Sequence, residues 1–153
     1  MTASPTGVEL DRHPFLHGLS PEVLGAIAAR TSRRHYETGA TIAREGDPAR
    51  EFFLIEAGKV ALELVPHDRP RLTILTLGPG EVVGWSWLVA PHRWRVDARA
   101  VKPTDVLVVD GSGLRSILDA HPTEGYRFLL RLVPVLALRL DATRLQVLDV
   151  HGP

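Results

Sequence analysis

Between residues 36 and 109, short runs of apolar and β-branched residues alternate with turns that contain glycine or proline. Branched side chains pack well on a pleated sheet, whereas glycine and proline suit the dihedral angles of tight turns. The turns recur about every 8–12 residues, which is typical of an antiparallel sandwich or roll. The sequence therefore predicts strands over residues 52–55, 59–65, 71–77, 96–101 and 106–109.

A helical pattern precedes this β-rich segment. Ser20 and Pro21 are the residue types of a helix cap and of a first helical position, and apolar residues follow at helical spacing to about residue 33. The first 12 residues are small and polar, and we expect them to form a loose tail. A single domain is predicted over residues 13–153.

Helical spacing returns after the β-rich segment. A short helix is predicted over residues 113–119, with Asp110 or Ser112 as its cap, and a longer one over residues 123–149. Pro134 lies inside the longer helix and should kink or break it, because proline removes a backbone hydrogen bond. One kinked helix and two separate helices both remain open.

The longer helix carries a stripe of residues that step alternately by four and three, namely Leu129, Val133, Leu136, Leu140, Thr143 and Val147. This spacing is typical of a coiled-coil seam. The stripe either packs on the β-rich part of the same chain or forms a two-fold seam between two copies. We expect a homodimer through this helix.

The composition excludes several classes of function. Lysine plus arginine and aspartate plus glutamate both total 18, and without a basic excess DNA is not expected as a direct partner. Cysteine is absent, which excludes disulfides, iron–sulfur clusters and thiolate zinc sites. The 7 histidines are scattered without metal-ligand spacing, so no metal site is predicted.

The motifs that the sequence lacks set our expectations for cellular location and enzyme activity. The sequence shows no signal peptide and no run of about 18 apolar residues, so we expect a cytoplasmic protein without a membrane partner. Ser86 lacks the second glycine of a nucleophile elbow, and no glycine-rich phosphate loop of the Walker type occurs. We therefore expect no enzyme activity and no catalytic residue.

Three spaced glycine turns carry a family resemblance. Residues 36–47 contain a tyrosine, a glycine and a Glu-Gly-Asp pattern, and residues 53–60 form a strand, a turn at Gly58 and a second strand. Together with the order helix, roll, helix, long helix, this resembles the cyclic-nucleotide-binding domain of the catabolite activator (CRP/FNR) family. The resemblance implies a mainly β fold with flanking helices, in which residues 36–110 form an antiparallel, jelly-roll-like double-stranded β-helix. It also implies cyclic AMP or cyclic GMP as the ligand.

The family's phosphate-binding cassette is altered in this chain. In the family it reads roughly Gly-Glu-x-Ala-Leu, and its glutamate accepts a hydrogen bond from the ribose 2′-hydroxyl. Here Gly84 and Leu88 match, but Trp85 replaces the glutamate and Trp87 replaces the alanine. A buried hydroxyl without its acceptor costs about 1–3 kcal/mol of binding free energy. The resemblance therefore implies a ligand pocket whose affinity for a cyclic nucleotide is reduced.

The family also places an arginine after the cassette, where it holds the cyclic phosphate with backbone amides of a short helix. Counting back from the strand at residues 98–100 puts Trp94 at that position, and a shift of one residue puts Arg95 there. Arg93 is also within reach, and we favour Arg95. Ser86 is expected to offer its hydroxyl or amide to the anion, and Thr143 matches the family's hydroxyl residue that contacts the adenine edge.

Two interpretations of the pocket remain open. In the first, the chain is a regulatory, non-enzymatic ligand-binding module, and the indoles of Trp85 and Trp87 stack on a small nucleotide-like molecule. In the second, the indoles plug the pocket, and the chain is a ligand-free module for dimerisation or protein interaction. Residues 148–150 resemble the end of the family's long helix, where a DNA-binding winged helix normally follows; we expect none here.

Overall fold

The computed structural model describes residues 4–151, apart from the side chains of residues 147 and 149–151. In this part of the chain, eight strands form two four-stranded antiparallel sheets, with strand orders β1-β8-β3-β6 and β2-β7-β4-β5. The strands are β1 (Thr31–Tyr36), β2 (Thr41–Ala43), β3 (Glu51–Ala57), β4 (Val60–Leu64), β5 (Leu72–Leu77), β6 (Val82–Val83), β7 (Asp97–Ala100) and β8 (Thr104–Asp110). Non-consecutive strands are neighbours, as expected for a jelly-roll-like β-roll. The predicted fold class is confirmed.

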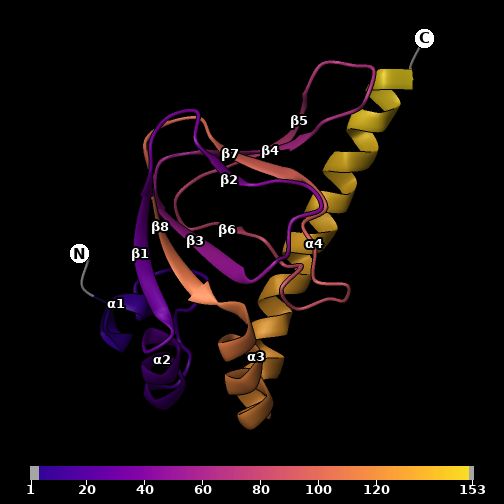
Figure 1. Cartoon of the computed structure of the whole chain (residues 1–153). Helices are drawn as coiled ribbons and strands as arrows, with labels where there is room; N and C mark the ends of the chain where they lie inside the picture. The colour runs from indigo at the N-terminus through magenta and orange to yellow at the C-terminus, as the bar shows by residue number, and fades with distance from the viewer. Residues whose placement is uncertain (1–3, 152–153) are drawn as a thin grey trace.

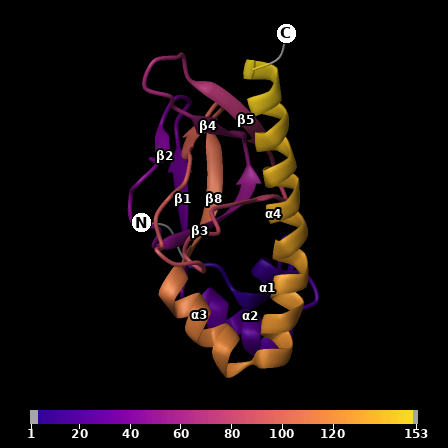
Figure 2. The ribbon, with the colours of Figure 1, turned by 90° about the vertical axis from the view of Figure 1, so that its right-hand side faces the viewer.

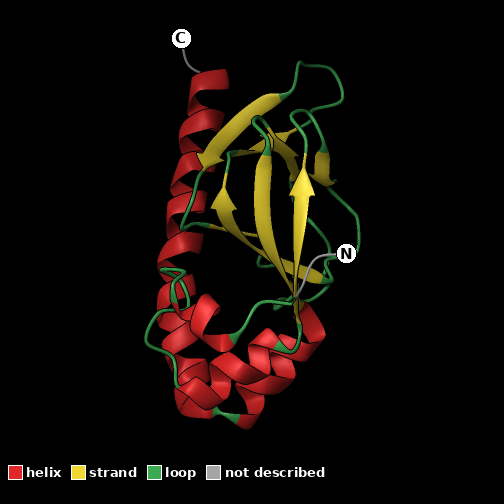
Figure 3. Ribbon diagram, turned by 90° about the vertical axis from the view of Figure 1, so that its left-hand side faces the viewer, coloured by secondary structure: helices red, strands yellow, loops and turns green. Residues whose placement is uncertain are grey.

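The helices are α1 (Gly7–Asp11), α2 (Pro21–Ala28), α3 (Gly111–Ala120) and α4 (Pro122–His151). The first three gather at one end of the roll, whereas α4 starts at that end and runs along the whole side of the roll (Figures 1 and 2). Figure 3 shows the same separation of a helical end from a β-rich end. No described helix is long and apolar enough to cross a membrane.

Among the described strands, β3, β4, β5, β7 and β8 form where the sequence predicts them, whereas β1, β2 and β6 were not predicted. The strand β3 illustrates why the prediction succeeds. Its successive side chains point to opposite faces of the sheet, as they do in any strand. Phe52 and Leu54 pack in a core beneath the helices, whereas Phe53 and Ile55 pack in a second core inside the roll. Because both faces are covered, the strand is apolar throughout. At the following turn, Gly58 has a φ of 100°, and a Cβ there would lie 2.4 Å from the carbonyl oxygen of Pro103.

The N-terminal part differs from the prediction in two places. The helix predicted to extend to about residue 33 ends at Ala28, because residues 31–36 pair with β8 along their whole length. Arg34 there forms an ion pair with Glu51 of β3, so contacts across the sheet outweigh the helical spacing. The segment expected to be a loose tail contains α1, which Thr6 caps and whose Leu10 is fully buried.

At the C-terminal end, Asp110 rather than Ser112 caps α3, since its side chain accepts a hydrogen bond from the backbone N–H of Gly113. The helix α4 is a single helix that continues through Pro134. Its first half is held by Phe128 and Leu132, which are buried in the core beneath the roll. Its second half lies beside β5 (Figure 2).

Candidate functional site

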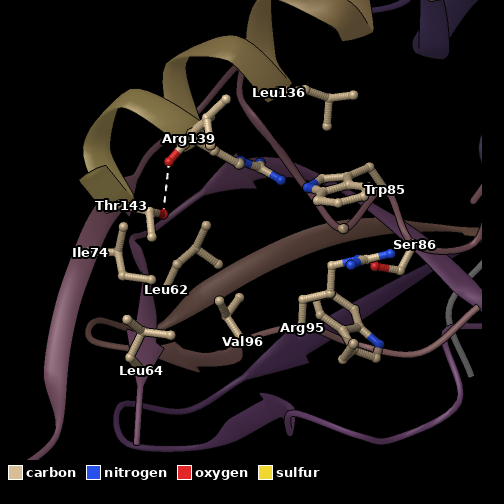
Figure 4. A pocket seen from close by; sticks show the side chains of 13 residues that line it. Leu62, Leu64, Ile74, Trp85, Ser86, Arg95, Val96, Leu136, Arg139 and Thr143 are labelled. Carbon is tan, nitrogen blue, oxygen red and sulfur yellow. Dashed lines mark hydrogen bonds between the residues drawn. The ribbon is translucent and has the colours of Figure 1, made fainter. Parts of the chain in front are cut away.

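A cavity of about 420 Å³ lies between the roll and the inner face of α4. Strands β4 and β5 supply one wall, the segment that follows β6 supplies the second, and α4 closes the third (Figure 4). The lining residues are Leu62, Leu64, Ile74, Gly84, Trp85, Ser86, Trp94, Arg95, Val96, Leu136, Arg139, Leu140 and Thr143. Most of these residues are apolar, so the cavity is an apolar pocket with a small number of polar groups.

Gly84 positions the second wall. Its φ is 90°, and a Cβ at this position would lie 2.8 Å from the indole of Trp94. A glycine is needed there both for the backbone conformation and for the close approach of the indole. Trp94 is consequently buried inside the roll, where its ring centroid lies 6.0 Å from that of Phe53. The side chain of Arg95, the next residue, is exposed and extends over the ring of Trp85.

Trp85 and Arg95 form one edge of the cavity. The guanidinium carbon of Arg95 lies 5.2 Å from the centroid of the Trp85 ring, which is a cation–π distance. The side chain of Ser86 lies nearby, and the residue is buried (Figure 4). Of the residues that the sequence analysis selects, Gly84, Trp85, Ser86, Trp94, Arg95 and Thr143 all line the cavity.

Trp87, Leu88 and Arg93, which the sequence also selects, lie outside the lining. Trp87 is 1% exposed, donates a hydrogen bond to the carbonyl of Gly84, and packs among aromatic rings of the core. Leu88 packs against the same core. Arg93 is exposed and donates to the carbonyl of Gly46 at 2.9 Å. The segment after β6 therefore turns from the cavity to the core between Ser86 and Trp87, which spacing alone did not reveal.

Arg139 is a cavity residue that the sequence analysis missed. It lies on the inner face of α4, one turn before Thr143, whose hydroxyl donates to the Arg139 carbonyl at 2.9 Å. The signal in the sequence was a charged residue near the end of the apolar-rich helical segment at residues 128–140. Burial lowers the pKa of the Arg139 guanidinium to about 10, and the nearby Glu81 carboxylate only partly offsets this effect.

The polar groups of the cavity are unbalanced in charge. The lining contains two arginines and two hydroxyls, but no aspartate or glutamate. Glu81 is an exposed residue outside the lining, and its carboxylate accepts a hydrogen bond from the backbone N–H of Gly78. The two guanidinium groups suit an anionic ligand, and the apolar walls suit a ligand with an apolar or aromatic body. No acidic group in the lining can accept a hydrogen bond from a ligand hydroxyl.

Comparisons with known proteins agree with this geometry. The family model for the cyclic nucleotide-binding domain matches residues 33–121. The Cyclic AMP receptor protein of Thermus thermophilus is 30% identical over 129 residues, which is 84% of this chain and 54% of that protein. A solved structure of a putative cyclic nucleotide-binding protein from Geobacter metallireducens has a TM-score of 0.78 at 26% identity, covering 89% of this chain and 98% of the other.

A second solved structure, the catabolite activator protein of Thermus thermophilus, has a TM-score of 0.69 at 28% identity and covers 90% of this chain and 63% of the other. The chain spans about half, or less, of the length of the first curated relatives that it matches. No winged helix lies within the described residues 4–151. The chain belongs to the cyclic nucleotide-binding domain family, and its relatives and neighbours place it with the regulators of the catabolite activator (CRP/FNR) type.

Proposed function

We propose that the chain is a regulatory, non-enzymatic module that binds a cyclic-nucleotide-like ligand in the cavity between the roll and α4. The observation that carries this proposal is the cavity itself, which is open although the indoles of Trp85 and Trp94 border it. Arg95 and the backbone amides of residues 84–86 hold the phosphate, and Thr143 lies near the base. The Thermus thermophilus relative is named a receptor for cyclic AMP, which supports cyclic AMP or cyclic GMP as the first ligands to test.

The altered cassette sets the expected affinity. Trp85 occupies the position of the ribose-binding glutamate in the family resemblance, and the lining offers no other carboxylate. A ribose hydroxyl left without an acceptor weakens binding by about 1–3 kcal/mol, which is about tenfold to a hundredfold in dissociation constant. We expect an aromatic base to recover part of this loss by stacking on the Trp85 indole.

The ligand acts through α4, which supplies four residues of the lining: Leu136, Arg139, Leu140 and Thr143. A ligand that contacts these residues favours one position of α4 over others, which is how a binding site biases a two-state element. Outside this lining, α4 has further exposed apolar side chains, which support homodimerisation through this helix. These side chains are Leu129, Leu130, Val133, Leu138, Leu145 and Leu148.

Calorimetric titration of the protein with cyclic AMP and cyclic GMP, with tryptophan fluorescence in parallel, tests the proposal. We expect saturable binding with a fluorescence change, and at least a tenfold loss of affinity in Arg95→Gln, because a charge-assisted hydrogen bond to the phosphate is removed. Arg144→Gln, an exposed position on α4 outside the lining, is the matched control. An absence of heat and of fluorescence change at millimolar nucleotide would contradict the proposal.

The exposed apolar side chains of α4 also favour the second interpretation, a ligand-free module for dimerisation or protein interaction. In that case the protein dimerises without any ligand, and nucleotides leave both the dimer and the tryptophan fluorescence unchanged. Sedimentation equilibrium of the wild type and of Val133→Glu, with and without cyclic AMP, separates the two interpretations. A monomer–dimer equilibrium that shifts with nucleotide supports the sensor.

A further inference from the structure

The guanidinium of Arg139 on α4 is incompletely hydrogen-bonded. Its guanidinium donates a hydrogen bond to the carbonyl of Val82, and its Nε atom is the one buried side-chain nitrogen or oxygen among the described residues that has no hydrogen-bond partner. No carboxylate lies within ion-pair distance of it in the described part of the chain. A buried polar atom without a partner is rare and costly in native proteins, so it calls for an explanation.

The fully buried acidic side chain of the roll, by contrast, is completely paired. Glu63 of β4 is 2% exposed, and its two carboxylate oxygens accept hydrogen bonds from Arg99 at 3.0 and 2.9 Å. Arg71 adds a third bond at 3.0 Å. The same fold therefore pairs a buried anion with two cations but leaves the buried Nε of a partly buried cation without a partner.

The position of Arg139 in the cavity indicates which kind of group could be the missing hydrogen-bond partner of its guanidinium. Figure 4 shows its guanidinium directed toward the indole of Trp85 across the cavity wall. In the family resemblance Trp85 replaces the acid that accepts from the ribose, so this corner of the pocket has changed from an acceptor to a cation. A guanidinium satisfies its nitrogens best with a carboxylate or phosphate oxygen pair, and the surrounding walls are apolar.

We infer that the cavity selects a monoanion with a planar aromatic part, and that Arg139 of α4 pairs with its anionic group. This inference rests on the proposed function in that it uses the same cavity, but it assigns the anion contact to the helix rather than to the cassette. Two kinds of molecule share this chemistry: an aromatic carboxylate, and a cyclic phosphodiester that carries a base. Both kinds are arms of the experiment.

The test compares 2-naphthoate with its neutral isostere 2-naphthamide, and both with cyclic AMP, by calorimetry on the full chain. We expect 2-naphthoate to bind about tenfold to a hundredfold more tightly than 2-naphthamide, because only the carboxylate makes charge-assisted hydrogen bonds. Arg139→Met should abolish this preference, Arg139→Lys should retain part of it, and Arg144→Gln should leave it unchanged. Circular dichroism and the melting temperature of each variant verify the fold.

The outcomes separate this inference from the proposed function. Equal affinity for the acid and the amide, or a preference that survives Arg139→Met in a folded protein, would overturn the inference even if cyclic AMP binds. Cyclic AMP binding that depends on Arg95 but not on Arg139 overturns the inference for the cyclic phosphodiester and supports the cassette as the nucleotide's anion site. Binding of 2-naphthoate through Arg139 without any binding of cyclic nucleotides sustains the inference and contradicts the nucleotide proposal.

Discussion

Trp85 and Trp87 are two residues apart in the sequence but belong to two different regions of the molecule. Trp87 lies in the closed core between the roll and the helices, where its ring packs against those of Phe52 and Phe128 and its N–H has a partner. Trp85 lies at the edge of the cavity, where Arg95 covers it and Arg139 faces it. The closed core satisfies its polar groups internally, whereas the cavity leaves a cation unpaired. The difference indicates which indole serves stability and which serves binding.

The largest expected effect comes from the closed core. Trp87→Ala removes a fully buried aromatic side chain and leaves a cavity, so we expect the free energy of unfolding to fall by about 3–5 kcal/mol. Trp85→Ala removes a partly exposed ring and should cost less than about 1 kcal/mol while abolishing the ligand-dependent fluorescence change. Urea denaturation of both variants measures the difference. Similar losses of stability in the two variants would break the comparison.

Gly84 connects the two regions, because it allows Trp94 to fill the roll at the edge of the cavity. Gly84→Ala should lower the free energy of unfolding by about 1–3 kcal/mol, since the backbone has a positive φ and the new methyl group meets the indole. Gly25→Ala, at an open position in α2, is the matched control and should be neutral or slightly stabilising. Equal melting temperatures for the two variants would show that the close approach of Trp94 is not required.

On the cavity side the expected effect has the opposite sign. Arg139→Met removes a buried, incompletely paired charge, so we expect the free energy of unfolding to rise by about 1 kcal/mol while the affinity for anions falls. The lowered pKa of Arg139, to about 10, reflects the same cost of burial. Thermal unfolding at neutral pH and low salt is the measurement. A clear loss of stability would mean that the guanidinium is structurally required, as a residue of the closed core would be.

The smallest effect concerns pH and the helical end. His13 is buried; Phe15 N–H donates to its Nδ1, and its Nε2 donates to the Ile55 carbonyl. Burial lowers the pKa of His13, so the folded state keeps the ring neutral while the unfolded state binds a proton below about 6.5. Stability from this group is therefore complete above pH 6.5 and declines as the pH falls toward 5.

Urea denaturation from pH 5 to 8 measures this decline, and His13→Gln should flatten it by less than about 1 kcal/mol. His35 contributes the opposite slope, because Asp105 raises its pKa, so the comparison uses the difference between wild type and variant at each pH. Identical slopes in the two proteins would mean that His13 titrates normally in the folded state.

The sequence predicted most of the roll because its pattern is local. Alternating apolar runs and glycine turns mark β3, β4, β5, β7 and β8 without any knowledge of their partners. The strand β1 was missed because residues 31–36 contain few apolar residues, and only pairing with β8 makes them a strand. The helix α1 was missed for a similar reason: its stability depends on burying Leu10 against α2, a contact that the tail's composition does not reveal.

The sequence predicted which segment forms a wall of the cavity, but not which of its side chains face the cavity. The order of the glycine turns led to residues 84–95, and six of the nine selected residues line the cavity. Which side chains face inward depends on the turn after β6, and this sent Trp87, Leu88 and Arg93 elsewhere. Arg139 escaped because a charge within a helical apolar stretch is usually solvated, and only packing against the roll reveals that this one is buried.

The attachment of α4 makes it a mechanical lever. Phe128 and Leu132 fix its first turns in the core, and about 19 residues, or about 28 Å at 1.5 Å per residue, extend beyond Leu132 along the roll. A tilt of about 5° at Pro134, where the backbone hydrogen-bond ladder lacks a donor, displaces the far end by about 2.2 Å. Under the proposed function, a ligand that tilts α4 by this amount at the cavity would displace the backbone at the far end of the helix by about 2 Å.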